Sequence, residues 1–356
     1  MGIHPAFKLN GIHFDEDGLY ELAYSWVKEG QDFEKAAGNF LLEWLGPSES
    51  IPVQTSGSTG QPKIIEISKE FMVNSALTTG RFFELKPRSS ALLCLSAQHI
   101  AGKMMLVRAL ILGLELDIVA PSSKPLTVHQ KQYGFCAMVP LQVENSLADL
   151  QNIEKLIVGG APISKSLRKA LAKQRGTIFE TYGMTETVTH IAVREIGNVK
   201  SGMYETYFRT LPDIQIERDE RGCLVIVAPK VAAERIVTND LVEIRDDTHF
   251  KWLGRFDNVI NSGGVKLIPE RIEEKLAPLI ENRFFAFGIP HGQLGEELVL
   301  IIEGDLDREV LQKGIDNLRD LDKFEKPKQI LSTPKFVETK NGKIRREETV
   351  LQLRQT

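Results

Sequence analysis

Short apolar runs, each followed by a turn and then a helical pattern, are the feature that most constrains this fold. Ala91–Leu95 leads into a polar loop and an apolar helical pattern that reaches Leu112. Lys155–Val158 ends in Gly159-Gly160-Ala161-Pro162, and Ser164 then stands where a helix N-cap is expected. Such strand–turn–helix units predict an α/β fold with wound βα units. Ligands of open α/β sheets bind at the carboxyl ends of strands, so we expect a site near these turns.

The second half of the chain has a different pattern. Alternating apolar residues over 214–226 and 241–253 predict two hairpins, and hence a small β-rich subdomain at about 203–253. Beyond it, a helical pattern from Pro269 and apolar runs between 284 and 302 predict a small α+β domain. We therefore predict a large N-terminal domain over 1–256 and a small C-terminal domain over 257–356.

Composition excludes several classes of function. The 356 residues are enough for two or three domains, and a net charge of −4 gives no basic surface for nucleic acid. The three cysteines are scattered without a CxxC pair, which indicates a reducing compartment. Met1–Asn10 has no secretory pattern, and Met104–Ala120 is interrupted by charges and too short to span a bilayer. We expect a cytoplasmic protein without membrane or nucleic-acid partners.

The stretch Thr55–Lys63 reads TSGSTGQPK and has the composition of a phosphate-binding loop. Glycines let backbone N–H groups approach an anion closely, hydroxyls add donors, and Lys63 adds a positive charge. The spacing differs from that of the standard P-loop, because only two residues separate Gly57 from Gly60 and Ile64 follows the lysine. From composition alone, a flexible polar loop is an equal alternative.

Several motifs together resemble those of the adenylate-forming (acyl-CoA synthetase) superfamily. They are TSGSTGQPK, the GGAP turn after Val158, Tyr182-Gly183-Met184-Thr185-Glu186, the run Thr238-Asn239-Asp240, Gly254–Gly264, and the basic loop Pro334–Arg346. Asn239 and Asn258 depart from the glycine and the second aspartate that the family has at these places. Only 54 residues precede the glycine-rich loop, so the chain resembles a shortened member that lacks part of the usual N-terminal architecture.

The resemblance implies ATP, Mg²⁺ and CoA as ligands, and it implies a role for each matching residue. Lys343, Thr185 and Glu186 would be catalytic, with Glu186 on Mg²⁺, and Asp257 would be the hinge before the C-terminal domain. The ATP phosphates would bind Thr55, Ser56, Gly57, Ser58, Thr59, Gly60 and Lys63; adenine and ribose would bind Gly160, Ala161, Tyr182, Gly183, Asp240 and Arg255; CoA would pass Gly263 and Gly264.

The short N-terminus and the run from Asn239 to Glu270 look most like o-succinylbenzoate–CoA ligases of menaquinone biosynthesis. That acid keeps a second carboxylate after activation, and a buried carboxylate needs a cation or several donors. His190 and Arg194, soon after the YGMTE motif, are candidates for this role, Arg209 is a weaker one, and His99 is expected beside the acyl pocket. For each of them, a structural or surface role is the alternative.

Other functions fit the same motifs. The chain could activate another aryl or fatty acid, or it could be a stand-alone adenylation domain that serves a carrier protein. A nucleotide-binding module without catalysis is a further alternative, against which Lys343, Glu186 and Asp240 argue. The sequence does not indicate an oligomeric state.

Overall fold

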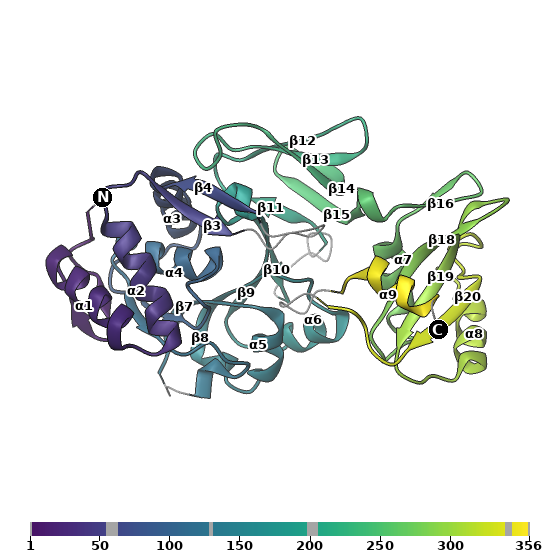
Figure 1. Ribbon diagram of the computed structural model, residues 1–356, viewed down its shortest axis with the longest axis horizontal. Coiled ribbons are helices and arrows are strands. Elements are labelled where there is room, and N and C mark those ends of the chain that lie inside the picture. The colour runs from purple at the N-terminus through teal and green to yellow at the C-terminus, as the bar shows by residue number, and fades with distance from the viewer. Residues whose placement is uncertain (1, 55–62, 128–130, 198–205, 339–343, 355–356) are drawn as a thin grey trace. The chain divides into compact units, whose positions relative to one another are not determined.

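The computed structural model describes residues 2–54, 63–127, 131–197, 206–338 and 344–354 (Figure 1). The chain divides into two compact units, each of which is described by itself. The first unit comprises Met1–Glu217, Val225–Ile236 and Ile244–Lys251; the second comprises Arg218–Leu224, Val237–Glu243 and Trp252–Thr356.

The first unit is built on a mixed sheet whose central strands are parallel. Its parallel order is β9-β8-β7-β5-β6-β1, and β2 is added antiparallel to β1. Beyond β9, the strands β10, β11 and β15 (His249–Arg255) are added antiparallel. The strands are β1 (Lys8–Leu9), β2 (Ile12–His13), β5 (Ser90–Leu93), β6 (Glu115–Ile118), β7 (Tyr133–Met138), β8 (Ile153–Val158), β9 (Thr177–Gly183), β10 (His190–Ile196) and β11 (Phe208–Thr210); β3 (Ser50–Gln54) and β4 (Ile64–Ser68) form a separate antiparallel pair.

Helices cover both faces of this sheet. On one face, α5 and α6 pack on alternate residues of the strands, including Cys136, Leu156 and Ile178. On the opposite face, Phe83 at the end of α3 packs on Phe135 and Phe179. The helices of this unit are α1 (Glu16–Glu29), α2 (Asp32–Leu45), α3 (Lys69–Phe82), α4 (Ile100–Leu112), α5 (Pro140–Asn145) and α6 (Lys165–Leu171), with 3-10 turns η1 (Pro125–Thr127), η2 (Leu150–Asn152) and η3 (Thr185–Thr187).

Local sequence explains where several helices begin and end. The hydroxyls of Ser68 and Ser164 accept backbone N–H groups at the starts of α3 and α6, as the sequence predicts for Ser164. Helix α4 is apolar almost all round because it is buried, and it ends at Gly113, whose left-handed conformation suits glycine. No helix in the described ranges is long and apolar enough to cross a membrane.

The second unit has its own core. Apolar residues alternate along β18 and β19, so α7 and α8 cover one face of the small sheet and α9 covers the other. Its elements are η4 (Phe256–Asn258), β16 (Ile260–Ser262), β17 (Val265–Leu267), α7 (Pro269–Leu276), β18 (Phe284–His291), β19 (Gly295–Glu303), α8 (Arg308–Asn317), β20 (Gln329–Thr333) and α9 (Arg346–Leu353).

Four strands have residues in both units. They are β12 (Gln215–Arg218), β13 (Cys223–Val227), β14 (Ile236–Asp246) and β15 (His249–Arg255). The predicted mixed α/β class with a large sheet is confirmed. The predicted β-rich subdomain and the boundary at Asp257 stay predictions.

Candidate active site

The turn after β8 and the end of β9 lie at the same edge of the sheet, because these strands are parallel neighbours. Gly160 is exposed and has a φ of +84°, which favours glycine, and Ala161 beside it is also exposed. Tyr182, near the end of β9, packs its ring against Phe208 and Phe250. The structure thus brings Gly160 and Ala161 to the edge where Tyr182 and Gly183 lie. Their predicted role around an adenine ring stays a prediction.

Gly183 makes the closest backbone approach at this edge. A Cβ on Gly183 would lie 2.3 Å from the carbonyl oxygen of Thr189, so only glycine fits between β9 and the start of β10. The 3-10 turn η3 follows it and presents Thr185 half-buried and Glu186 exposed. No group of three or more metal-ligating side chains lies in the described part of the chain, but one exposed carboxylate beside a hydroxyl fits an ion that completes its shell with phosphate oxygens.

Val188 closes this segment in a strained conformation. Its φ of 65° and ψ of −55° are rare for a β-branched residue, and its side chain is buried. The N–H of Thr189 donates to the carbonyl of Thr187 at 2.7 Å, so the three residues form a γ-turn of the strained hand. The turn reverses the chain between Glu186 and Thr189.

Behind this turn lies a buried arginine. Arg108 on α4 is 1 % exposed, and its Nη2 donates to the hydroxyl of Thr189 at 3.1 Å. Its Nη1 lies 3.7 Å from Met105 Sδ, a weak acceptor, and its Nε has no hydrogen-bond partner in the part of the chain that the structure describes. No carboxylate of the described residues is within ion-pair distance of it. Burial lowers the pKa of Arg108 to about 9, so the group is still charged at neutral pH.

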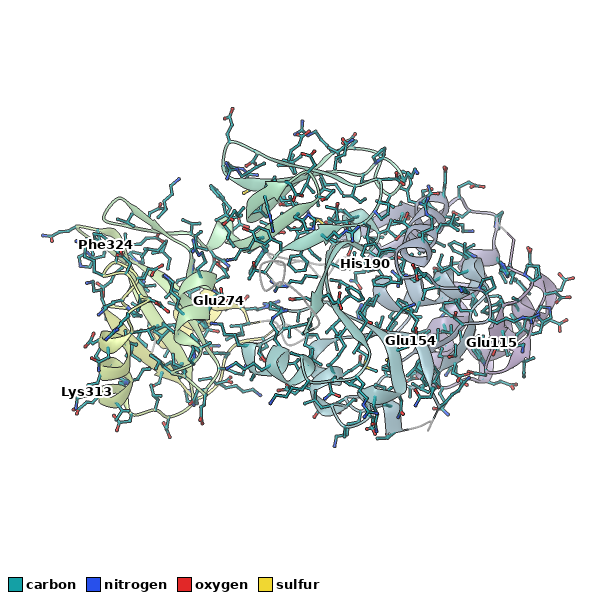
Figure 2. All side chains as sticks on the ribbon, turned by 180° about the vertical axis from the view of Figure 1, so that it is seen from behind. Glu115, Glu154, His190, Glu274, Lys313 and Phe324 are labelled. Atoms are coloured by element: carbon teal, nitrogen blue, oxygen red, sulfur yellow. The ribbon has the colours of Figure 1, made fainter. Side chains whose placement is uncertain are left out.

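His190 lies on the other side of Thr189. Figure 2 places it among the side chains inside the first unit, and it is 7 % exposed. Its Nδ1 is 3.4 Å from the Thr189 hydroxyl, its ring packs near Phe83, and its Nε2 has no partner among the described residues. Burial and then the charge of Arg108 hold the pKa of His190 well below its usual value, so the ring is neutral.

Arg194 has a different environment. Its Nε donates to Glu180 at 2.6 Å, Arg168 of α6 donates to the same carboxylate oxygen, and its guanidinium stacks over Phe208. His190 instead packs towards Phe83, which contacts Phe179, the neighbour of Glu180 on β9. Successive residues of a strand point to opposite faces, so His190 and Arg194 lie on opposite faces of the sheet. A register shift in β10 between His190 and Ala192 produces this arrangement.

His99 stands at the N-cap of α4, at the end of the loop that follows β5, and its side chain is exposed without a cap hydrogen bond. This places it at the carboxyl edge of the parallel strands, as predicted. Lys63 is exposed before β4. Thr55 to Gly60 and Lys343 lie outside the described residues.

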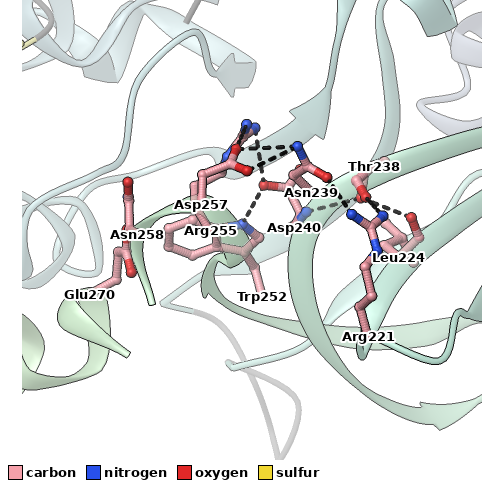
Figure 3. Close-up of polar contacts among 10 residues, drawn as sticks. All are labelled: Arg221, Leu224, Thr238, Asn239, Asp240, Trp252, Arg255, Asp257, Asn258 and Glu270. Carbon is pink, nitrogen blue, oxygen red and sulfur yellow. Dashed lines mark hydrogen bonds and ion pairs between the residues drawn. The ribbon is translucent and has the colours of Figure 1, made fainter. Parts of the chain in front are cut away.

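A polar network in the second unit joins the predicted ribose and hinge residues (Figure 3). The buried carboxylate of Asp240 accepts from the Trp252 indole N–H at 3.1 Å and lies 3.7 Å from Arg255 Nη1. Arg255 Nη2 also donates to Asp257 at 2.9 Å. The amide of Asn239 donates to both Asp257 oxygens at 3.2 Å.

Each of the two unusual asparagines also makes a further side-chain contact, Asn239 with Arg221 in this network and Asn258 with Glu270 apart from it. Arg221 donates to the side-chain oxygen of Asn239 at 2.9 Å and to the carbonyl of Thr238 at 3.0 Å. Asn258 donates to Glu270 of α7. A glycine or an aspartate at these two positions could not make the same bonds.

Gly263 and Gly264 form the turn between β16 and β17, with φ values of +58° and +84°. Both are exposed, and a Cβ on Gly264 would meet no atom within 4 Å. The backbone is therefore accessible at this turn, and the predicted contact with CoA stays a prediction.

Comparisons with known proteins identify the family. The model of the family described as AMP-binding enzyme matches residues 51–225. The crystal structure of an acyl-CoA synthetase (AMP-forming)/AMP-acid ligase II-like protein from Dyadobacter fermentans is 34 % identical, and the match covers 94 % of this chain and 98 % of that one with a TM-score of 0.61. This chain belongs to the AMP-binding enzyme family.

Two further similar proteins are more distant. A curated relative from Bacillus cytotoxicus, named 2-succinylbenzoate–CoA ligase, is 25 % identical over 277 residues, which are 65 % of this chain and 57 % of the relative. The structure of O-succinylbenzoate coenzyme A synthetase from Bacillus subtilis, in complex with ATP and magnesium ion, is 18 % identical, covers 93 % of this chain and 82 % of that one, and has a TM-score of 0.73. The second likeness shows the fold alone.

Arg108 is the residue of this AMP-binding enzyme that the sequence interpretation missed. It is the one charged residue in the apolar stretch from Met104 to Leu114, and from the sequence it indicates only that this stretch does not span a membrane. A lone arginine within a helix that is otherwise buried was the available signal, because such a charge is costly unless it has a partner.

Proposed function

We propose that this protein is an ATP-dependent carboxylate–CoA ligase that acts through an acyl adenylate. The acid is o-succinylbenzoate, and the product, o-succinylbenzoyl-CoA, belongs to menaquinone biosynthesis. The proposal rests on family membership, on the activities after which the two relatives are named, and on one observation in particular. That observation is a buried, charged Arg108 that bonds Thr189, just after the YGMTE segment, and has no carboxylate within ion-pair distance among the described residues.

Arg108 favours an acid with two carboxylates. Taking a guanidinium out of water costs several kcal/mol unless an anion compensates it. A second carboxylate of the substrate offers that compensation, and the guanidinium offers a planar fork of donors that suits it. A monocarboxylic acid has no group left for this arginine once its single carboxylate reacts. His99, at the same edge of the sheet, would lie near the aromatic part of the acid.

In the first step, a carboxylate oxygen of the acid attacks the α-phosphorus of ATP. The bond from this phosphorus to the bridging oxygen breaks, and pyrophosphate leaves with the electron pair. Charge builds on the phosphate oxygens, so catalysis consists mainly of positioning and charge neutralisation. The donors would be Lys343, the hydroxyl of Thr185, Lys63 and the loop from Thr55 to Gly60.

Mg²⁺, when bound, would neutralise phosphate charge, and the exposed carboxylate of Glu186 fits it. Asp240 can accept both hydroxyls of the ribose, Arg255 beside it would contact the same sugar, and Gly160, Ala161 and Tyr182 would line the adenine. Gly183 would be part of this surface.

In the second step, the thiol of CoA loses its proton and attacks the carbonyl carbon of the adenylate. The bond to the AMP oxygen breaks, AMP leaves, and a thioester remains. The exposed backbone at Gly263 and Gly264 would bind the pantetheine arm. Asp257 would be the hinge about which a C-terminal domain turns between the two steps.

ATP–pyrophosphate exchange tests the proposal. We would compare o-succinylbenzoate, benzoate and a medium-chain fatty acid in the wild type and in Lys343→Ala and Arg108→Met. Methionine fills a similar apolar volume, so Arg108→Met is expected to fold while it loses the anion partner.

Two results would support the proposal. The first is exchange that depends on o-succinylbenzoate and is lost in Lys343→Ala. The second is a KM for this acid that rises about 10- to 100-fold in Arg108→Met, since a charge-assisted bond contributes about 1.5–3 kcal/mol. Exchange with the fatty acid instead would keep the chemistry and discard the acid. No exchange with any acid, in protein that binds ATP, would contradict a ligase.

A further inference from the structure

We infer that Thr189 and His190 are a positioning pair that fixes the guanidinium of Arg108 for the second carboxylate and so sets the selectivity of the site for dicarboxylic acids. The inference rests on the proposed function. It adds to that function two residues that do not touch the reacting atoms and whose effect is on which acid is accepted.

The first argument is that Thr189 is the only strong acceptor on Arg108 among the described residues. The hydroxyl accepts from Nη2 at 3.1 Å, whereas Met105 Sδ is a weak partner for Nη1 and Nε has none. A guanidinium has five donors, so this one is held at one corner and keeps most of its donors for an anion. Without Thr189 the group would keep its charge but lose the contact that sets its direction.

The second argument concerns the proton on His190. The Thr189 hydroxyl uses one lone pair for Arg108, and its own proton then has His190 Nδ1, at 3.4 Å, as acceptor. This arrangement requires the tautomer with the proton on Nε2. The other tautomer would leave the hydroxyl proton without an acceptor and Nε2 without a donor, so it leaves two groups unsatisfied instead of one.

The third argument is that the surroundings suit this tautomer. Nε2 is the buried ring atom without a partner among the described residues, and His190 lines a pocket together with Ser75, Thr78 and Thr187. The pocket has about 10 Å³ of space, close to the minimum for one water molecule, and its hydroxyls can complete the shell of such a water. A neutral ring also avoids a second positive charge beside Arg108, in agreement with the lowered pKa of His190.

The γ-turn at Val188 explains why the pair can affect selectivity. It places Thr189 only four residues after Thr185, but directs its hydroxyl to the buried helix α4. The segment that contains Thr185, which is proposed to hold the α-phosphate, thus also positions Arg108, which is proposed to bind the second carboxylate of the acid. An acid that spans both points is positioned by a single rigid segment.

The experiment uses the full chain with Thr189→Val and Thr189→Ser. Valine has the shape of threonine without the hydroxyl, and serine keeps the hydroxyl. In ATP–pyrophosphate exchange, Thr189→Val is expected to raise the KM for o-succinylbenzoate about tenfold with the KM for ATP changed less than about twofold, since one hydrogen bond to a charged group is lost. Thr189→Ser is expected to restore the KM to within about threefold of the wild type. An unchanged KM in Thr189→Val, or an equal rise for ATP, would overturn the inference.

A second readout does not depend on the acid. The ¹⁵N chemical shifts of the His190 ring, assigned by comparison with His190→Phe, are expected to show the Nε2–H tautomer in the wild type and in Thr189→Ser, and a different tautomer balance in Thr189→Val. An Nδ1–H ring, or identical spectra in all three proteins, would overturn the pairing. If the wild type shows no exchange with o-succinylbenzoate, the proposed function fails, and these spectra still decide whether the pair exists.

Discussion

Trp252 donates its indole N–H to the carboxylate of Asp240 at 3.1 Å, and Arg255 lies 3.7 Å from the same oxygen. Asp240 is thus oriented by two neighbours before any ligand binds. Asp240→Ala is expected to raise the dissociation constant of AMP at least about tenfold, since a bond to a charged group contributes about 1.5–3 kcal/mol. Trp252→Phe removes only the indole N–H that orients Asp240, and it is expected to raise the dissociation constant of AMP about threefold.

Isothermal titration with AMP measures both effects, and Trp26→Phe on α1 is the matched control for loss of an indole. An AMP affinity in Asp240→Ala equal to that of the wild type would remove this carboxylate from the ribose site.

The sequence predicted the parts of the fold that follow from short-range patterns. Strands β5 and β8 lie where short apolar runs predict them, helix α4 ends at Leu112 where its apolar pattern ends, and helix α6 follows the predicted cap Ser164. Strand β10 was not predicted. A register shift interrupts its alternating pattern next to Gly183, and its position depends on pairing with β9, which short-range sequence patterns do not show.

The motifs single out Asp240 and Arg255, and the structure places Asp240 Oδ1 3.7 Å from Arg255 Nη1; their role in binding ribose stays a prediction. Sequence spacing could not show that the side chains of His190 and Arg194 lie apart. The register shift in β10 directs them to opposite faces of the sheet, and it depends on the pairing with β9. Arg108 lies 81 residues from Thr189 in sequence, so only the packing of α4 brings the two together.

Glu180 is predicted to be a structural anion that holds Arg168 and Arg194. Its carboxylate is buried, and both arginines donate to it. Glu180→Gln leaves two arginines without a counter-charge and is expected to lower the free energy of unfolding by about 3 kcal/mol.

Chemical denaturation measures this change. Glu217→Gln is the control, because Glu217 pairs with Arg235 at 3.1 Å with both side chains more than half exposed, and such a pair contributes about 0–1 kcal/mol. An equal, small effect of the two substitutions would show that Arg168 and Arg194 do not need the charge of Glu180.

His190 is predicted to make the fold less stable in acid. Its pKa is lowered in the folded state, so below the ordinary value of about 6.5 the unfolded chain binds the proton first. The unfolded state then binds more protons, and the free energy of unfolding falls as pH drops, by up to about 1.4 kcal/mol per pH unit from this group. The charged groups nearby are Arg108 and, at the rim of the pocket, the pair Asp213–Lys230.

Urea unfolding at pH 7.5, 6.5 and 5.5 compares the wild type with His190→Phe, whose stability should fall less over this range. The difference between the two proteins isolates His190 from the carboxylates, which titrate in both. Parallel curves would mean that the ring takes up its proton as readily in the folded protein as in the unfolded chain.

Val188 provides a test of strain in the segment that bears Thr185 and Glu186. Replacing alanine by glycine in an ordinary chain segment usually lowers stability by about 0.5–1 kcal/mol. At φ 65° and ψ −55° the glycine variant should instead be the more stable of the two. Glycine adopts a positive φ freely, while alanine keeps the strain, which costs about 1–3 kcal/mol. Both variants lose the two buried γ-methyl groups of valine, and glycine also loses the buried Cβ, which by itself would lower its stability. A glycine variant that is nevertheless the more stable one therefore reports relief of backbone strain. We therefore expect Val188→Gly to unfold at a higher urea concentration than Val188→Ala. If Val188→Ala is the more stable of the two, the γ-turn does not store strain, and the rigidity of this segment must come from its packing.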